Sequence, residues 1–462
     1  MVVLSVFADA AADDSTNLNS LWLIIGAAMV LLMTPGLAFF YGGMVKSKSV
    51  ISMMMMSFGA IALVSVLWVL YGFSMSFGLQ GTDKAGNTVI TDWLIPHWLL
   101  NPFSNAGLLQ YIGQDKATGF MAGAAANTAS LNSVADTNGL AFVAFQATFA
   151  IITVALISGA IADRAKFGAW MVFAGVWATL VYFPVASWVF NFAVTTAKNG
   201  VVTVTDGGWS VFQLGVNDFA GGTAVHINAG AAGLALALVL GKRVGFAKGM
   251  NAPHNVPLTL LGAALLWFGW FGFNAGSAAA VTTTSAIAWI NTLAAPAAGI
   301  IGWIVVEKIK DGKSTSIGAA SGAVAGLVAI TPACNILTPF WGIVLGITVG
   351  ALCAVSIELK YKLGFDDSLD VVGIHLIGGL WGTLYIGIFG SGIGLLSTGK
   401  FNQLGAQAIG GFGVAIYSFV MAFIIGWIIQ KTMGFRITNE DEVAGVDVTV
   451  HGEEAYEIPA TV

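Results

Sequence analysis

Two histidines inside long apolar stretches are the strongest candidates for chemistry in this sequence. His226 follows Ala-Val and His375 follows Gly-Ile, with few charged residues nearby. Ionisable side chains are costly to bury in hydrocarbon, so each one is a functional hypothesis by default. Burial disfavours the charged imidazole, and a neutral ring carries one donor and one acceptor nitrogen. Two such rings side by side would share a proton and present polar edges to a narrow pore.

Other interpretations of His226 and His375 stay open at this point. The rings could be helix-packing residues bonded to the backbone, or ligands of a metal. A metal site would need a third ligand, and the HExxH pattern is absent, so we predict no metal and no cofactor. Cys334 and Cys353 show no CxxC or ligand spacing and therefore indicate neither a disulfide framework nor a zinc site.

Asp218 and two aromatic motifs could also contribute to a site. Asp218 stands where an apolar stretch begins, so it either attracts a cation near an entrance or caps a helix. The motifs at 145–149 and 267–277 offer ring faces for cation–π attraction. Aromatic stripes at helical spacing usually face lipid or core, and composition alone does not overturn that interpretation.

The composition indicates that a bilayer surrounds these residues. Hydrophobic residues make up 57% of the 462 positions and charged residues 9%, and the mean hydropathy is +0.85, which excludes a soluble globular chain. The 59 glycines are expected where helices pack closely in a membrane. A net charge of -5 without a basic stripe argues against nucleic acid as a partner.

Eleven windows are long enough to cross about 30 Å of hydrocarbon. They begin near Ser20, Val50, Asn138, Gly168, Phe219, Leu258, Ser285, Ser316, Pro339, Val371 and Ala406. Basic residues in the connections orient the chain, because cytoplasmic loops are enriched in Lys and Arg. With the N-terminus outside, the cytoplasmic side holds Lys46, Lys48, Arg164, Lys166, Lys242, Arg243, Lys248, Lys308, Lys310, Lys313, Lys360, Lys362, Lys431 and Arg436. Only Lys84, Lys116, Lys198 and Lys400 remain outside, so we predict an N-out, C-in topology.

This topology divides the chain into three parts. Residues 1–19 form an external tail, residues 20–433 the membrane domain and residues 434–462 an acidic, partly disordered cytoplasmic tail. The first residues lack the basic n-region of a signal peptide, although the sequence leaves cleavage open. The polar segment 80–137 is expected to cover the outer mouth.

An internal repeat relates the two histidines. Superimposing them aligns Val225-His226-Ile227 with Ile374-His375-Leu376, aligns Gly230 and Gly233 with Gly379 and Gly382, and leaves an acidic residue before each, Asp218 and Asp370. The histidines fall in the fifth and tenth predicted spans. An odd offset of five helices gives inverted topology, which many transporters use around a mid-membrane site. The fold class predicted is therefore an all-α polytopic membrane protein, with two five-helix inverted repeats and a final helix.

Four motifs together resemble a known family. They are Asp-Phe-Ala-Gly-Gly-Thr-x-Val-His (218–226), Gly-Trp-Phe-Gly-Phe-Asn-Ala-Gly-Ser (269–277), Asp-x-x-Gly-x-His (370–375) and His-Gly-Glu-x-Ala-Tyr (451–456). The chain is similar to ammonium transporters of the Amt/Mep/Rh family, on the bacterial Amt side, from about Ser20 to Tyr456. The resemblance implies a transporter of ammonium or ammonia in the bacterial cytoplasmic membrane, with methylammonium as an analogue, and not an enzyme.

The resemblance also assigns roles to residues of this chain. It implies a twin-histidine pore at His226 and His375. Substrate contacts at an outer recruitment site map to Phe145, Phe149 and Ser277, and a phenyl gate maps to Phe149 and Phe273. Trp270, a further substrate-binding candidate, and Thr331 match positions that line the path. Gln146, Asp218 and Asp370 map near these sites, and the resemblance favours a structural role for Asp218 over direct binding of the ion.

One position departs from the family pattern. The family usually has a tryptophan eight residues after the tyrosine that matches Tyr182, and this chain has Phe190 there and Trp188 two residues earlier. A phenyl ring gives weaker cation–π attraction than an indole. Either recruitment is weaker here, or Trp209 or another ring from the loop 191–217 completes the site.

The resemblance further implies a homotrimer and a cytoplasmic tail that meets a PII-family signalling protein. Three alternatives to ammonium transport stay open: a Rhesus-like gas channel, an ammonium sensor, and, more distantly, an intramembrane metalloenzyme using His226, His375 and Asp218. The sensor would need an appended signalling domain, whereas about 29 residues follow the last predicted span.

Overall fold

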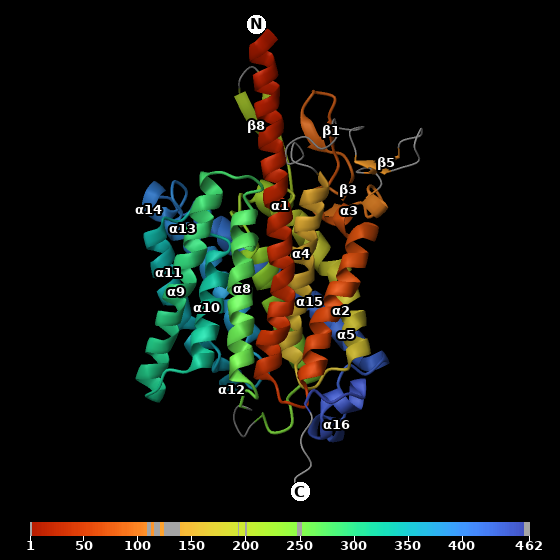
Figure 1. Ribbon diagram of the computed structural model, residues 1–462, viewed down its shortest axis with the longest axis vertical. Coiled ribbons are helices and arrows are strands. Elements are labelled where there is room, and N and C mark those ends of the chain that lie inside the picture. The colour runs from red at the N-terminus through yellow and green to blue at the C-terminus, as the bar shows by residue number, and fades with distance from the viewer. Residues whose placement is uncertain are drawn as a thin grey trace.

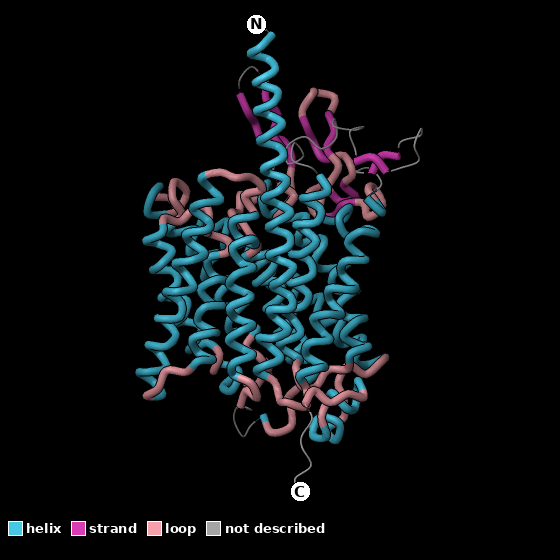
Figure 2. The backbone as a smooth tube through the Cα atoms, in the orientation of Figure 1, coloured by secondary structure: helices cyan, strands magenta, loops and turns pink. Residues whose placement is uncertain are grey.

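The chain folds into a bundle of long, roughly parallel helices with short strands gathered at one end (Figures 1 and 2). The computed structural model describes the backbone of residues 2–108, 112–114, 121–123, 139–192, 194–198, 201–246 and 252–456. Side chains are described in the same ranges except at 2–17, 112–114, 121–123, 194–198 and 201–203. The first helix begins at the end where the strands lie, and the last short helices lie at the opposite end (Figure 1).

Ten helical segments of the described chain are long and apolar enough to cross a membrane. Four of them lie in a single helix: Leu18–Met44 in α1 (Val2–Met44), α8 (Val256–Gly276), α9 (Thr283–Asp311) and α15 (Asn402–Thr432). Two are made of three helical pieces: Val50–Ser76 of α2 (Val50–Leu67), η1 (Trp68–Gly72) and α3 (Phe73–Ser76), and Phe167–Val189 of α5 (Phe167–Trp177), η4 (Ala178–Tyr182) and α6 (Phe183–Val189). Four contain two pieces: Gly139–Ile161 with α4 (Gly139–Ile157) and η3 (Ser158–Ile161), Gly222–Leu240 with η6 (Gly222–Ile227) and α7 (Asn228–Leu240), Pro339–Leu363 with α11 (Pro339–Ser356) and α12 (Leu359–Leu363), and Val372–Phe389 with η8 (Val372–Leu376) and α13 (Ile377–Phe389).

The eleventh predicted span is a shorter helix. α10 (Ser316–Ile330) has 15 residues, fewer than the roughly 20 that cross a bilayer alone. It ends before Pro332, which cannot continue a helix. Every predicted start has a helix nearby, and the largest difference is between Ala406 and Asn402. The chain is therefore an all-α polytopic membrane protein, as predicted, with one span shorter than expected. The start near Asn138 lies just outside the described residues.

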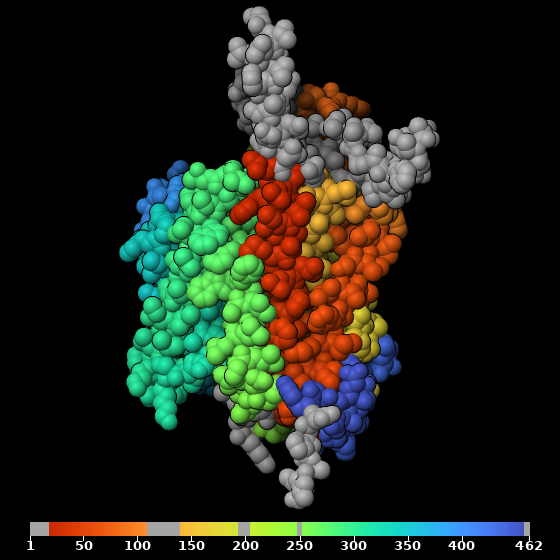
Figure 3. Space-filling model, viewed as in Figure 1, coloured from red at the N-terminus to blue at the C-terminus, as the bar shows by residue number. Residues whose placement is uncertain are grey.

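Close helix packing depends on glycine at specific contacts. A Cβ at Gly302 of α9 would lie 2.1 Å from the carbonyl oxygen of Ile347, and one at Gly350 of α11 would lie 2.2 Å from the carbonyl oxygen of Gly299. The backbones of α9 and α11 therefore approach each other too closely for any larger residue. Figure 3 shows side chains of α1 (red), α2 (orange) and α8 (light green) filling one face of the same bundle.

Short antiparallel strand pairs form the end of the bundle that the predicted topology places outside, which we call the outer end. β1 (Gln80–Thr82) pairs with β2 (Thr88–Ile90), β3 (Trp93–Ile95) with β4 (Leu99–Leu100), β5 (Ile112–Gln114) with β6 (Met121–Gly123), and β7 (Val194–Lys198) with β8 (Val201–Asp206). The same end holds η2 (Ala106–Leu108), η5 (Trp209–Gln213) and α14 (Leu395–Thr398). Much of the predicted mouth-covering segment, 109–111, 115–120 and 124–137, lies outside the described residues.

We give the name outer cap to residues 77–108, 194–198 and 201–213, and Asp206 joins its two parts. Its carboxylate accepts hydrogen bonds from the backbone N–H of Ile90 at 2.8 Å and from Trp93 Nε1 at 3.4 Å. His97 Nδ1 lies 2.8 Å from the carbonyl oxygen of Gly207 and 3.2 Å from Asp206 Oδ1. The two halves of the outer cap are thus one unit, although they are almost a hundred residues apart in sequence.

The C-terminal tail, which the predicted topology places in the cytoplasm, is folded through Tyr456, where the sequence suggested partial disorder. It contains α16 (Asn439–Ala444) and η9 (Asp447–His451). Asp447 accepts hydrogen bonds from the backbone N–H groups of Ile51 and Ser52 at the start of α2, and the buried Glu442 accepts from the N–H of Val244 at 2.7 Å. Two of the acidic residues that suggested a solvated tail are therefore partners of a helix start and a loop of the membrane domain.

A buried cluster of charges joins three central spans at their ends on the side of the C-terminal tail. Arg243, after α7, forms ion pairs of 2.9 Å with Asp163, which follows η3, and with Asp366, which precedes η8. Burial alone would raise the pKa of the Asp366 carboxyl, but hydrogen bonds from Arg243 and the charge of Arg164 hold that pKa below its ordinary value. Arg164 is fully buried, which lowers its pKa to about 10.

Candidate functional site

Both histidines lie in π-helical turns at the start of their spans. His226 is in η6 and His375 in η8, and each turn continues into an ordinary α-helix. The N–H of His226 donates to the carbonyl of Gly221 at 3.1 Å, a five-residue step that widens the helix locally. Such π-bulges are rare and often occur at functional sites. In both halves of the predicted repeat, the histidine therefore lies in a π-helical turn.

The two imidazole rings meet in the buried centre of the bundle. Their Nδ1 atoms are 3.2 Å apart, and the ring planes are inclined by only 19° with centroids 5.3 Å apart. His226 is 1% exposed and His375 4%. His226 Nε2 has no hydrogen-bond partner within the described residues. The structure thus brings together the two residues that the sequence singled out and leaves a polar ring edge free.

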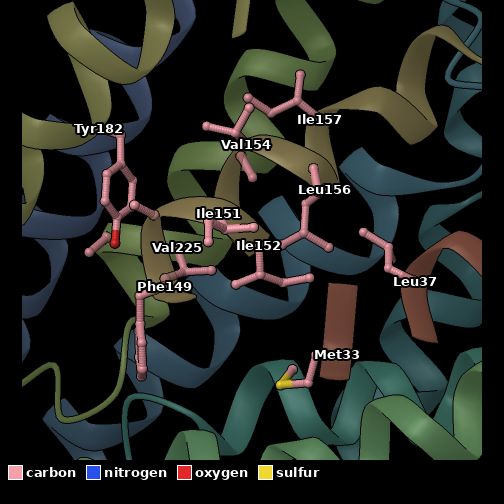
Figure 4. Close-up of a cluster of buried hydrophobic side chains, with 14 of the residues drawn as sticks. Met33, Leu37, Phe149, Ile151, Ile152, Val154, Leu156, Ile157, Tyr182 and Val225 are labelled. Atoms are coloured by element: carbon pink, nitrogen blue, oxygen red, sulfur yellow. The ribbon is translucent and has the colours of Figure 1, made fainter. Parts of the chain in front are cut away.

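A narrow cavity runs beside the histidine pair. Its volume is about 10 Å³, near the smallest that admits one water-sized molecule. Apart from the two histidines, its walls are apolar or aromatic: Met33, Leu37, Phe40, Ile152, Leu156, Val225, Leu266, Trp270, Phe273 and Val324. Figure 4 shows several of these side chains, including Met33, Leu37, Ile152 and Val225, converging from different helices. A cavity of this size and lining suits a small neutral molecule.

Two stacked phenyl rings lie at this cavity, and one of them, Phe273, lines it. Phe149 of α4 and Phe273 of α8 are stacked with centroids 4.1 Å apart and planes inclined by 19°. Both rings are 0% exposed, and Phe273 lies 6.1 Å from the His226 ring. The two residues of the predicted phenyl gate are therefore stacked on each other in the structure, and their role as a gate stays a prediction.

The predicted recruitment residues lie on the other side of the gate. Phe145 contacts Phe149 with ring centroids 4.9 Å apart. Its ring occupies space that only glycine leaves, because a Cβ at Gly276 would lie 2.8 Å from it. Ser277, which is partly exposed, donates its hydroxyl to the carbonyl of Phe273 at 2.8 Å and keeps its own oxygen free to accept. Gln146 is buried next to Phe145 in sequence.

Trp270 lies beside the histidines, inside the gate. Its ring stacks on His226 with centroids 5.3 Å apart. Its Nε1 donates to Thr331 Oγ1 at 2.8 Å, and Thr331 donates to the carbonyl of Leu327. This chain of hydrogen bonds fixes the indole, so that it forms a rigid wall against which His226 is held.

Asp218 is a helix cap. Its carboxylate accepts hydrogen bonds from the backbone N–H groups of Gly221, Gly222, Thr223 and Ala224 at 2.6 to 3.2 Å, and from the Thr223 hydroxyl. Asp218 is 6% exposed. These five donors occupy the carboxylate, so the capping interpretation fits the structure better than direct attraction of a cation.

The counterpart of Asp218 in the second repeat is Asp367, whereas the sequence comparison selected Asp370. Asp367 accepts from the N–H groups of Val371 and Val372 at the start of η8. It stands eight residues before His375, as Asp218 stands eight residues before His226. Asp370 instead pairs with Lys360 at 2.5 Å. The constant spacing was visible in the sequence, but the adjacent acidic residues obscured it.

Phe190 is the ring that contacts the gate at the divergent position. It meets Phe149 edge-on with centroids 5.9 Å apart. Trp188 donates Nε1 to the carbonyl of Trp98 and contacts the rings of Trp98 and Trp209 in the outer cap. Trp188 and Trp209, the two tryptophans that could have replaced the missing indole, therefore pack in the outer cap.

Sequence patterns identified the polar and aromatic members of the site but not its apolar walls. Residues such as Ile152, Leu156 and Val324 look like any other membrane-helix residue. Within the described ranges, no three His, Cys, Asp or Glu side chains are placed together to hold a metal ion.

Comparisons with known proteins place this geometry in context. The model of the Ammonium Transporter Family matches residues 21–456. An ammonium transporter of Mycobacterium bovis is 49% identical over 453 residues, covering 95% of this chain and 90% of its own length. An ammonium transporter of Bacillus subtilis is 43% identical over 446 residues, with 95% and 98% coverage.

Solved structures give the same result for the fold. The crystal structure of Saccharomyces cerevisiae Mep2 aligns with a TM-score of 0.79 and 30% identity, covering 96% of this chain and 92% of that one. A sensor Amt protein aligns with a TM-score of 0.79 and 25% identity, covering 95% and 99%.

Proposed function

The chain belongs to the ammonium transporter family and transports ammonium as a multi-pass protein of the cytoplasmic membrane, and we propose that it does so by separating the ion into ammonia and a proton at the phenyl gate. The observation that carries this proposal is the stacked Phe149–Phe273 pair at a cavity of about 10 Å³ that Phe273 lines together with the two histidines. The steps are recruitment, deprotonation and passage.

Recruitment takes place at Phe145, Phe149 and Ser277. A phenyl face attracts a monovalent cation by about 0.5–1 kcal/mol at exposed sites and by more when water is removed. The Ser277 oxygen accepts a hydrogen bond from the ion, since its own proton is directed to the carbonyl of Phe273. Asp218 acts indirectly in this scheme, because its carboxylate holds the start of the His226 helix.

Deprotonation occurs at the gate because the cavity beyond it is too small and apolar for a hydrated ion. The idealised cost of moving an ammonium-sized ion into a medium of low dielectric constant is on the order of 20 kcal/mol. Ammonia avoids this cost, and it can still hydrogen-bond to the free Nε2 of His226. Trp270 and Thr331 keep that ring in place.

The proton follows through the imidazole pair, so that transport carries net charge. The 3.2 Å distance between the Nδ1 atoms is short enough for a proton to pass between the rings. Purified protein in planar bilayers should give a current when ammonium is added on one side. Normal uptake by the same preparation without any current would overturn this step and leave net ammonia transport.

Competition with methylammonium tests the role of the pair separately. We expect His226→Ala to lose methylammonium uptake and its competition by ammonium. His97→Gln, which changes a histidine of the outer cap, serves as the matched control and should keep both. Unchanged methylammonium uptake in His226→Ala would show that the assigned role of His226 is wrong.

We also propose that three copies of the chain assemble, each with its own pore. This proposal rests on membership of the family and on the pore lying within one chain, because His226, His375 and both gate residues come from the same bundle. Mass measurement of the detergent-solubilised protein should give three chains. A monomer that retains full uptake after reconstitution would argue against the trimer.

The third proposal is that residues 434–462 form a cytoplasmic regulatory tail that a PII-family protein recognises. The folded part supports this, because Arg436 donates to the carbonyl of Leu240 at the end of the His226 helix. A bound protein at the tail would therefore act on a pore helix. Purified PII protein should be retained by immobilised transporter and lost when Arg436 and Glu442 are both replaced by Ala; equal retention would refute the assignment to the tail.

A further inference from the structure

We propose that the outer cap carries a membrane anchor of its own, in which Phe103 and the neighbouring apolar residues of 93–108 enter the interfacial layer of the outer leaflet. The partner is the lipid surface. This inference concerns how the outer cap is held over the bundle, and it does not depend on the transport mechanism.

The segment from Phe103 to Leu108 lies beside the outer end of a membrane span. The backbone N–H of Asn105 donates to Ser74 Oγ at 3.0 Å. Ser74 belongs to α3, inside the membrane-crossing segment Val50–Ser76. The following turn η2 packs against η1, which lies still deeper in the same segment. The chain from Phe103 to Leu108 therefore descends alongside the outer end of a membrane span.

The Phe103 side chain and several side chains of the neighbouring span are exposed. Phe103 is 78% exposed, although it lies only two residues from the Asn105 contact with the span. On the span itself, Val66, Val69 and Leu70 are between 46% and 56% exposed, as expected of residues that face lipid. The exposed phenyl ring therefore lies near the outer end of a span whose own exposed side chains include these apolar residues.

The segment around Phe103 is uncharged and rich in apolar residues. From Trp93 to Gln114 the sequence contains no Asp, Glu, Lys or Arg. Leu94 and Ile95 are more than half exposed, and Trp98 is 39% exposed. Large exposed apolar patches on proteins mark a contact surface, and aromatic rings are enriched where a membrane meets water. An uncharged, aromatic, exposed loop at that level fits a lipid surface.

The rest of the outer cap shows that this arrangement is not general. Val204 in β8 is apolar and 54% exposed, but β8 pairs with β7 and packs against β2, within the outer cap itself. Asp83 and Lys84 lie at the turn between β1 and β2. The anchor is thus restricted to residues 93–108, and Val204 supplies a matched apolar control.

Site-directed spin labelling can measure the depth of these positions directly. Both native cysteines within the described chain, Cys334 and Cys353, are buried, so a nitroxide reagent will label an introduced cysteine selectively. We suggest Phe103→Cys, with Leu94→Cys as a second position in the anchor, Leu70→Cys as a lipid-facing reference and Val204→Cys as the control. Each variant is reconstituted in full length into phosphatidylglycerol–phosphatidylethanolamine vesicles and checked for ammonium uptake.

We expect relaxation of the nitroxides at 103 and 94 to be enhanced several-fold more by oxygen, which partitions into lipid, than by a water-soluble nickel chelate. Position 70 should behave in the same way and position 204 in the opposite way. A nitroxide at 103 that is as accessible to nickel as the one at 204 would overturn the proposal. Shielding of 103 from both reagents would also overturn it, because a second protein copy would then cover the patch.

Discussion

Replacing Asp218 by Ala tests whether this carboxylate is a helix cap or an attractor of ammonium. The change leaves the four N–H groups of Gly221, Gly222, Thr223 and Ala224 without their acceptor. An attractor would be needed for substrate affinity alone. A cap would be needed for the start of the His226 helix, and hence for stability.

The magnitude follows from the hydrogen bonds. A buried donor left without a partner costs about 1–3 kcal/mol, and partial rescue by water brings the total for Asp218→Ala to about 4 kcal/mol. Asn at this position keeps one oxygen, which can still accept from Gly221 and Gly222, while its amide nitrogen faces the N–H of Thr223. We therefore expect Asp218→Asn to lose roughly half as much stability as Asp218→Ala.

Thermal denaturation in detergent, followed by loss of the folded protein peak on size exclusion, gives the comparison. A cost of about 4 kcal/mol should lower the midpoint by about 5 °C in a chain of this size. The exposed Asp311 at the end of α9 provides the control, since Asp311→Ala should shift the midpoint by less than about 1 °C. The reasoning is refuted if Asp218→Ala melts like the wild type while its KM for methylammonium rises.

Three further changes have distinct expected outcomes. Phe190→Trp places an indole beside Phe149 and should lower the KM for methylammonium uptake by about two- to fivefold, from a gain of roughly 0.5–1 kcal/mol in cation–π attraction; an unchanged KM would mean that this ring does not contact the ion. Gly350→Ala puts a Cβ 2.2 Å from a carbonyl oxygen of α9 and should reduce the yield of folded protein, whereas Gly405→Ala, which meets nothing within 4 Å, should not. Asp366→Asn removes one of the two carboxylate partners of Arg243 and should cost about 3 kcal/mol at pH 7. Because the folded pKa of Asp366 is lowered, its contribution is complete above the unfolded value of about 3.9 and is lost as pH falls through the folded value, so the difference in melting midpoint should shrink below about pH 4; a difference that is constant with pH would contradict this account.

The helices were predictable because a membrane imposes one strong rule. About 20 apolar residues must form a helix when no water satisfies the backbone, and this rule located every span to within a few residues. It failed for the length of α10, where Pro332 ends the helix early. It also had no means of showing that the tail is folded, because Glu442 and Asp447 find their partners, Val244 and the start of α2, hundreds of residues away.

The site was predictable where residue type is unusual for its surroundings. Histidines in hydrocarbon, and the repeated spacing around them, are enough to indicate His226 and His375 from the amino-acid sequence alone. The π-helical turns that carry them have no distinctive side-chain pattern, and the apolar walls of the cavity differ from lipid-facing residues only in direction. Asp367 was missed for another reason: Asp366, Asp367 and Asp370 are close neighbours, and only hydrogen-bond geometry separates their roles.

The contact between two Nδ1 atoms has a consequence for the timing of repeated proton transfer. For a proton to enter at His226 and leave at His375, His226 must first carry its hydrogen on Nδ1 and His375 on Nε2. After one transfer the arrangement is reversed: His226 holds hydrogen on Nε2 and His375 on Nδ1. A second proton from the same side finds no free nitrogen until the pair has been reset, by ring rotation or by proton exchange with a passing molecule. Trp270 and the cavity walls hold the rings tightly, so the histidine pair transfers one proton and must then regain its starting tautomers. The rate of this return limits how fast charge can cross.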